Sequence, residues 1–134
     1  MLDKIIERLV TTFEPMGFDI HTERVPEVKT PLYMDVIKFH TMTKQIGVDK
    51  FEVTDAYSIR IVIDGKDKQS RLDILRDKIS FMMSDIDKSP VTKKINEELF
   101  VFLTDRYLLT QREYDALLEQ LFIETKLKGD SYET

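Results

Sequence analysis

The segment FEVTDAYSIRIVID, residues 51–64, constrains the fold more than any other part of the chain. Its apolar residues occupy odd positions: Phe51, Val53, Tyr57, Ile59, Ile61 and Ile63. Alternation with a period of two indicates a strand that is buried on one face. The pattern lasts for about thirteen residues, whereas a strand in a globular protein has roughly five or six.

A straight strand of this length would be about as long as the folded chain is wide. Thirteen residues at about 3.3 Å each span roughly 43 Å, and a compact chain of 134 residues has a diameter of about 36 Å. The strand therefore either bends at a bulge near Asp55-Ala56 or extends beyond the globule as one side of a hairpin arm. An exposed arm would offer backbone groups that can pair with a neighbouring subunit. Both alternatives stay open.

If the arm exists, it consists of residues 41–50 and the first part of the long strand. The candidate interaction residues are Thr41, Met42, Thr43, Lys44, Gln45, Ile46, Val48, Lys50, Phe51 and Val53. The other half of the strand, Tyr57–Ile63, is expected to form the buried centre of a sheet beneath a helix.

The part of the chain before the long strand predicts a helix, a loop and a strand. Residues 2–13 carry an apolar stripe at helical spacing that ends at Pro15 and Gly17. Residues 18–31 predict a surface loop with a short extended piece at 18–21. Residues 32–40 (LYMDVIKFH) predict a strand, which a long, mobile hairpin tip at 41–50 joins to the long strand.

The part after the long strand predicts a second helix and further strands. Residues 66–88 are amphipathic, and Ser70 with Asp73 resembles a capping box that would start the helix near Ser70. Ser89-Pro90 ends this segment. Residues 99–103 and 106–110 predict two strands.

The C-terminal segment from Tyr114 to Leu127 fits two structures. A helix would align Tyr114, Leu117, Leu118, Leu121 and Phe122, and a strand would align Leu117, Leu121, Ile123 and Leu127. Periodicity does not decide between them. Residues 129–134 are expected to be disordered. Together the elements predict a single domain over residues 1–134 with an α+β fold, in which two main α-helices pack on one face of an antiparallel or mixed β-sheet.

Composition disfavours several classes of partner. The net charge of −5 is spread over the chain, with 8 basic and 11 acidic residues in 1–64 and 12 and 14 in 65–134. This distribution disfavours specific nucleic-acid binding. No apolar run approaches the roughly 20 residues of a membrane span, and MLDKIIERLVTTF is not expected to be a secretory signal. The absence of cysteine excludes disulfides and thiol nucleophiles, and a reducing cytoplasm is the simplest compartment.

The chemistry-bearing residues do not form a recognisable catalytic, metal or cofactor motif. His21 and His40 lack ligand spacing, and the four glycines form no phosphate loop. Asp64 and Asp67 flank a strand-to-helix turn, where turn formation explains them. We therefore expect no enzyme activity, no metal and no cofactor.

Three like-residue pairs also have ordinary structural interpretations. Lys93-Lys94 and Glu97-Glu98 are interpreted as solvated loop residues. Met82-Met83 is interpreted as part of the core of an amphipathic helix.

The order of elements resembles that of the small tail-completion proteins of long-tailed bacteriophages. The resemblance rests on the Pro31-Leu32-Tyr33 entry into TPLYMDVIKFH, the long strand DKFEVTDAYSIRIVIDG and the charged helix KDKQSRLDILRDKISFMM. It covers about residues 1–85. In this family the last third returns as antiparallel strands, which favours a strand at Leu117–Leu127, although QREYDALLEQ lacks the family's glycine near the turn.

The resemblance implies a tail terminator or head-to-tail joining protein. Such proteins are non-enzymatic, need no cofactor and form a hexameric ring that caps the tail tube and docks it onto the head connector. The implied partners are the chain itself, the tail-tube protein and a head-completion protein, and the implied location is the virion, after assembly in the host cytoplasm.

Two other hypotheses remain. One is a small monomeric or dimeric ligand-binding or regulatory module with a pocket between sheet and helix. The other is a hydrolase or nuclease that uses Asp64 and Asp67.

Overall fold

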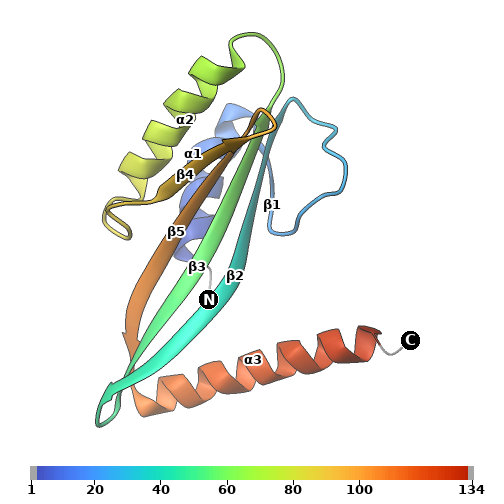
Figure 1. Ribbon diagram of the computed structural model, residues 1–134. Helices are drawn as coiled ribbons and strands as arrows, with labels where there is room; N and C mark the ends of the chain where they lie inside the picture. The colour runs from blue at the N-terminus through green and yellow to red at the C-terminus, as the bar shows by residue number, and fades with distance from the viewer. Residues whose placement is uncertain (1–2, 133–134) are drawn as a thin grey trace. The chain divides into compact units, whose positions relative to one another are not determined.

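Residues 3–132 form a mixed five-stranded sheet with three α-helices (Figure 1). The computed structural model describes the backbone of residues 3–132 and the side chains of residues 3–123. Its elements are α1 (Lys4–Phe13), the 3-10 turn η1 (Glu14–Met16), β1 (Asp19–His21), β2 (Leu32–Gly47), β3 (Lys50–Ile63), α2 (Lys68–Met82), β4 (Val91–Ile95), β5 (Glu98–Leu109) and α3 (Gln111–Tyr132). The strand order is β1-β2-β3-β5-β4, with β1 parallel to β2 and β4 antiparallel to β5. The predicted α+β fold is confirmed.

Contacts divide the chain into two compact units. The first contains Met1–Thr41 and Asp55–Asp105, and the second contains Met42–Thr54 and Arg106–Thr134. The sequence predicts one domain for residues 1–134 and contains no signal for this division. The physical reason is that β2, β3 and β5 each have residues in both units, so no Pro- or Gly-rich linker marks the boundary.

One face of the sheet forms the core of the first unit, beneath α1 and α2. Figure 1 shows both helices on the same side of the sheet. The helices and the strands contribute the buried residues Ile5, Leu9, Phe13, Met34, Val36, Ile59, Ile61, Ile63, Leu72, Leu75, Ile79, Leu99, Val101 and Leu103. Fully burying one such side chain contributes about 1.5–3 kcal/mol. The expectation that Tyr57–Ile63 is the buried centre beneath the second helix is confirmed.

The first helix is fixed at its start by Asp3. The Asp3 Oδ1 atom accepts hydrogen bonds from the backbone N–H groups of Ile5 and Ile6, which caps the helix. The other carboxylate oxygen accepts a hydrogen bond from the Tyr57 hydroxyl at 2.5 Å. Burial, followed by the contact with Asp3, raises the pKa of Tyr57 above its usual range. Asp3 therefore joins α1 to the central strand.

The long strand β3 is continuous, and its buried face extends to its N-terminal end. Every odd residue from Phe51 to Ile63 is buried, including Asp55, whose Oδ1 atom accepts a hydrogen bond from Thr41 Oγ1 at 2.7 Å. The expectation that Phe51 and Val53 are exposed contact residues is therefore wrong, because their exposed fractions are 6% and 0%. Phe51 is covered by the Tyr114 ring, which stacks on it with a centroid distance of 4.1 Å.

The connection between β2 and β3 is a two-residue turn, Val48-Asp49. The predicted long tip at 41–50 is wrong, because residues 41–47 belong to β2. Their side chains are mostly polar and mostly exposed, and they lack the alternation that identifies a half-buried strand. Asp49 has a φ of 55°, and its carboxylate accepts a hydrogen bond from the Gln111 N–H at the start of α3.

The second helix starts earlier than its sequence predicts. Asp67, with a φ of 60°, precedes the first residue of α2, and no side-chain hydrogen bond caps this end. The predicted capping box at Ser70 is wrong: Asp73 instead forms ion pairs with Lys94 and Arg76.

A β-hairpin follows α2 where a loop was expected. Lys93 and Lys94 belong to β4, and Glu98 begins β5, so the loop interpretation of these residues is wrong. The turn residues Asn96 and Glu97 have φ values of 53° and 63°, a combination typical of tight hairpins. The two strands predicted at 99–103 and 106–110 form the single strand β5. The edge strand escapes detection because its side chains are largely exposed on both faces.

The C-terminal segment is a helix, so the strand interpretation of Leu117–Leu127 is wrong. α3 extends to Tyr132, and residues 133 and 134 lie outside the described part of the chain. The expected disorder of residues 129–134 stays a prediction.

The left-handed backbone at Gly17 yields a first testable prediction. Gly17 ends the α1–η1 segment with a φ of +98°, and a Cβ atom there would make only an ordinary contact, 3.5 Å from Leu32 Cδ1. Gly17→Ala should therefore lower the free energy of unfolding by about 1–2 kcal/mol, through backbone strain alone. The matched control is Gly47→Ala, whose φ is not left-handed and whose Cβ has room. Urea denaturation that shows equal stability for the two variants would contradict the prediction.

A bidentate ion pair joins α1 to the segment after α2. Arg8 Nη1 and Nη2 donate to Asp85 Oδ1 and Oδ2 at 2.6 and 2.8 Å. The hydrogen bonds from Arg8 lower the pKa of the Asp85 carboxyl to about 2. Since the folded-state pKa is depressed, the pair stabilises the protein above about pH 4, and this contribution is lost as the pH falls through about 2.

Asp85→Asn should therefore be less stable than the parent at pH 6, and the difference should shrink toward pH 2.5. The measurement is the urea midpoint of both proteins across this range. Asp77→Asn, which removes an exposed carboxylate beside Arg76, serves as the control. A parent-to-variant difference that does not change with pH would refute this assignment.

Candidate interaction surface

The face of the sheet opposite α1 and α2 is covered in one part and open in another. The covering segment is the loop at 22–31, between β1 and β2. Beneath it, Tyr33 and Asp35 are fully buried. Farther along the same face, Phe39 is exposed and Phe102 is half-buried. The boundary between the two parts defines a candidate interaction surface.

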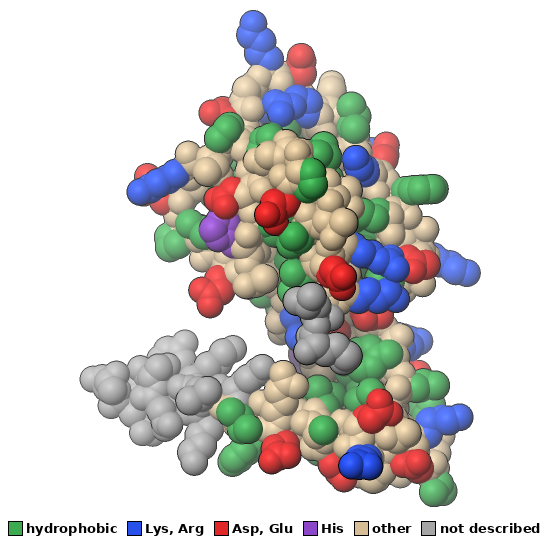
Figure 2. All heavy atoms as spheres, turned by 180° about the vertical axis from the view of Figure 1, so that it is seen from behind, with side chains coloured by type: hydrophobic (Ala, Val, Ile, Leu, Met, Phe, Trp, Pro, Cys, Tyr) green, Lys and Arg blue, Asp and Glu red, His purple; other side chains and the backbone are tan. Residues whose placement is uncertain are grey.

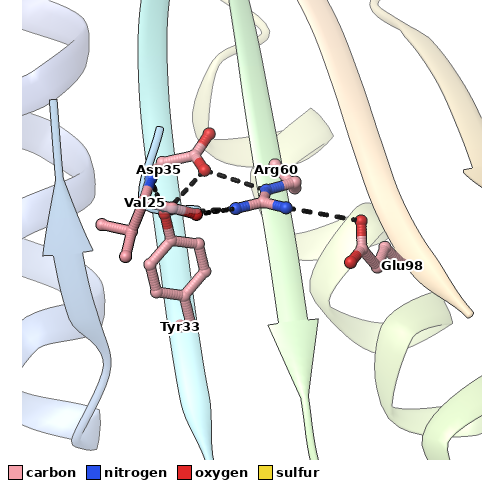
Figure 3. A network of polar contacts seen from close by, with 5 residues as sticks. All are labelled: Val25, Tyr33, Asp35, Arg60 and Glu98. Carbon is pink, nitrogen blue, oxygen red and sulfur yellow. Dashed lines mark hydrogen bonds and ion pairs between the residues drawn. The ribbon is translucent and has the colours of Figure 1, made fainter. Parts of the chain in front are cut away.

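A polar network holds the loop on the covered part (Figure 3). Arg60, on β3, donates from Nε to Asp35 Oδ2 at 2.9 Å and from Nη2 to the Val25 carbonyl at 3.4 Å and the Tyr33 hydroxyl at 3.3 Å. The Tyr33 hydroxyl donates to Asp35 Oδ2 at 2.8 Å and accepts from the Val25 N–H at 3.2 Å. Glu98 on β5 completes the network with an ion pair to Arg60 at 3.8 Å. Both backbone groups of Val25 are thus bound to the sheet.

The charge at the centre of this network is stable. Burial alone would lower the pKa of Arg60, but the hydrogen bonds with Tyr33 and Asp35 outweigh it and raise that pKa. For the Tyr33 hydroxyl, burial has the opposite effect: it raises the pKa, so the hydroxyl keeps its proton and remains a hydrogen-bond donor. The guanidinium also lies over the Tyr33 ring, 5.1 Å from its centroid. The one orphaned polar atom of the network is Asp35 Oδ1, which has no hydrogen-bond partner among the described residues.

The open part of the face is an apolar floor with aromatic side chains. A hollow of about 330 Å³ is lined by Arg24, Ile37, Phe39, Ser58 and Phe102. The Phe39 and Phe102 rings meet edge to face at a centroid distance of 6.5 Å, and Phe100 stacks beside Phe102. The Phe39 side chain is 56% exposed. Exposed aromatic clusters of this kind are typical of surfaces that bind another protein.

The edge strand β4 extends this floor. Val91 pairs with Phe102 and Lys93 pairs with Phe100, so the paired side chains lie on the same face. Val91 and Ile95 are 55% and 48% exposed. The open sheet face, as we call it below, therefore consists of Ile37, Phe39, Phe100, Phe102, Val91 and Ile95.

Two cations border the open sheet face. Arg24 lines the hollow and directly precedes Val25, whose backbone the Arg60 network binds. Lys93 lies on the edge strand. Within the described part of the chain, no carboxylate forms an ion pair with either side chain. Elsewhere, acidic and basic side chains are interspersed over the molecular surface seen in Figure 2.

The predicted arm residues lie almost entirely in the second unit. Thr41 is half-buried, whereas the residues from Met42 to Lys50 are exposed. Their hydrogen bonds are local: Thr43 Oγ1 lies 3.4 Å from the Tyr114 hydroxyl, and Gln45 donates to the Gly47 carbonyl. Among the side chains described in this unit, the exposed large apolar residues are Met42, Ile46, Val48, Leu108, Leu118, Phe122 and Ile123. The second unit therefore has an apolar surface of its own.

The other chemistry-bearing residues that the structure describes lie apart from one another or have local partners. His21 Nε2 is bound to Asp19 at 2.8 Å. Asp64 accepts a hydrogen bond from the Gly65 N–H, as a turn residue does. Among the described residues, no group of three or more His, Asp or Glu side chains could hold a metal ion. None of the described helices is long and apolar enough to cross a membrane.

Comparison with known proteins adds no relative: no family model matches the chain, and no curated protein is similar to it.

The residues of the open sheet face were not among the predicted interaction residues. A signal for them exists in LFVFL, residues 99–103, where apolar residues occupy both faces of the strand. That run predicts a strand covered on both sides, and in a single chain only one side is covered.

Replacing Arg60 tests the network. Arg60→Met should lower the free energy of unfolding by about 3–5 kcal/mol, because it leaves the Asp35 carboxylate buried without its cation. Adding Asp35→Leu should recover most of that loss, because both charges are then removed. The control is Arg106→Met, because Arg106 is 69% exposed and its ion pair with Glu52 is long, at 3.8 Å. This substitution should lower the free energy of unfolding by less than about 1 kcal/mol. Additive effects of the two network substitutions in urea denaturation would contradict this account.

Proposed function

We propose that this protein is a non-enzymatic structural subunit that assembles with copies of itself. The observation that carries the proposal is the open sheet face, whose apolar floor faces solvent although α1 and α2 cover the opposite face. Contiguous apolar surface bordered by polar residues is usual at protein–protein interfaces. The second unit supplies a different apolar surface. Two unlike surfaces on one chain favour head-to-tail association, which produces a ring when the rotation between copies closes.

The more specific proposal is a tail-completion protein of a long-tailed bacteriophage. It rests on the resemblance of residues 1–85 to that family in element order. In this role the chain forms a ring at the head-proximal end of the tail, as a tail terminator or as a head-to-tail joining protein. The ring, a hexamer in the resembling family, would contact the tail-tube protein on one side and a head-completion protein on the other.

A small ligand-binding module is the competing function. A hollow of about 290 Å³, lined by Met16, Phe18, Leu32, Arg71, Ile74 and Leu75, is the observation that favours it. Its volume lies at the lower limit for ligand pockets, which are roughly 300–1,000 Å³. A thermal-shift screen with metabolites tests this function, and strong stabilisation of a monomer would favour it.

If the protein self-associates through the open sheet face, replacing Phe39 should affect assembly and not folding. Phe39→Glu should weaken assembly, because it places a charge on the apolar floor, and should leave folding intact because the parent side chain is largely exposed. The matched control is Phe81→Glu on α2, where the parent ring is 83% exposed and lies outside the open face. Size-exclusion chromatography with light scattering measures the mass of each variant.

The biological role is tested with purified components. We expect the parent protein and Phe81→Glu to bind the ends of purified phage tails and to support head joining, and Phe39→Glu to lose both activities. Tails that join heads equally well without this protein would overturn the assignment to tail completion.

A further inference from the structure

Helix α3 exposes an apolar pair with an acidic pair beside it. Leu118 and Phe122 are four residues apart and are 43% and 68% exposed. Residues four apart on a helix are neighbours on its surface, so these two side chains form one apolar patch. Asp115 and Glu119 have the same spacing and lie next to the Phe122 side of the patch. The segment 111–123 has one basic and three acidic residues, Arg112 against Glu113, Asp115 and Glu119, a net charge of 1 − 3 = −2.

The open sheet face has the complementary composition. Its floor is aromatic, with Phe39 and Phe102 in contact, and its border carries Arg24 and Lys93. An apolar helix side with acidic flanks therefore matches it in both hydrophobicity and charge. Both surfaces are exposed in the single chain, so each is accessible to a second copy of the chain.

We propose that α3 of one copy docks on the open sheet face of a second copy, with Leu118 and Phe122 on the aromatic floor and Asp115 and Glu119 near Arg24 and Lys93. This inference rests on the proposed self-assembly and names the two surfaces that meet. The contact is heterologous: each copy gives its helix to one neighbour and its sheet face to the other. Repetition of such a contact produces a ring when the rotation closes.

The absence of native cysteine makes a site-specific cross-linking test possible. One variant carries Val91→Cys on β4, and a second, with an affinity tag that changes its size, carries Leu118→Cys on α3. After mixing and treatment with a short bifunctional maleimide, we expect a mixed covalent dimer in clear excess over either homodimer. The control replaces Val91→Cys with Ile74→Cys, because Ile74 is 66% exposed on α2, outside the open sheet face. This control should give no mixed dimer above background.

A chain that carries both Val91→Cys and Leu118→Cys separates contact between copies from contact within one copy. We expect it to form a ladder of covalent oligomers. Cross-linking only within single chains would overturn the inference, as would a mixed dimer no more abundant than in the Ile74→Cys control.

Charge exchange gives an independent readout. Lys93→Glu and Glu119→Lys should each weaken self-association by about fivefold, and their combination in one chain should restore it. Failure of the combination to restore association would contradict the proposed placement of Glu119 near Lys93.

Mass measurement distinguishes the two levels of the proposal. An oligomer that gives no mixed cross-link would show that the chain assembles through other surfaces, so this inference alone would fail. A protein that stays monomeric at all concentrations and does not bind tails would refute the proposed function itself.

Discussion

The buried guanidinium of Arg60 is the interaction on which the second face of the sheet depends. It stands on the central strand with only 12% of its side chain exposed, and it binds β2 through Asp35, β5 through Glu98 and the loop through Val25. A buried charge is costly unless it is paired and hydrogen-bonded. The network meets that requirement, and in doing so it fixes where the 22–31 loop covers the sheet and where the cover ends. The open sheet face begins at this boundary.

The same strand explains the other half of the fold. The odd residues of β3 are buried in both units: Tyr57, Ile59, Ile61 and Ile63 belong to the core beneath α1 and α2. In the second unit, Phe51 stacks on Tyr114 of α3. The even residue Arg60 points to the other face and organises the polar network there. Alternation along one strand thus separates a packed core from a partly polar, partly open surface.

Sequence patterning predicted the elements with strong periodicity. Ile5, Leu9 and Phe13 identify α1, and the odd residues of β3 identify the central strand, because burial on one face leaves a regular signal. The edge strand β4 and residues 41–47 of β2 leave no such signal, since their side chains are largely exposed on both faces. The length of the strand predicts that Phe51 is exposed on a projecting arm. Its cover, Tyr114, is distant in sequence and lies in a segment that fits both a helix and a strand, so the sequence does not reveal the contact.

The candidate surface was harder to predict than the fold. The open sheet face combines Phe39 from β2, Phe102 from β5 and Val91 from β4, three residues that only strand pairing brings together. Arg24 joins them because the Arg60 network holds the adjacent Val25. Neither the strand pairing nor the contact between Arg60 and Val25 produces a regular spacing of residues that can be recognised in the sequence. The sequence predicts an interaction surface on the hairpin residues, whereas the candidate surface in the structure lies on β2, β4 and β5.

Amide hydrogen exchange measured over a range of protein concentrations tests the central claim, self-assembly through the open sheet face, most directly. The account predicts that exchange slows with concentration in β4, in the adjacent part of β5 and in α3, while the core of the first unit does not change. Exchange that is independent of concentration in these segments, or protection confined to the outer surfaces of α1 and α2, would contradict the account.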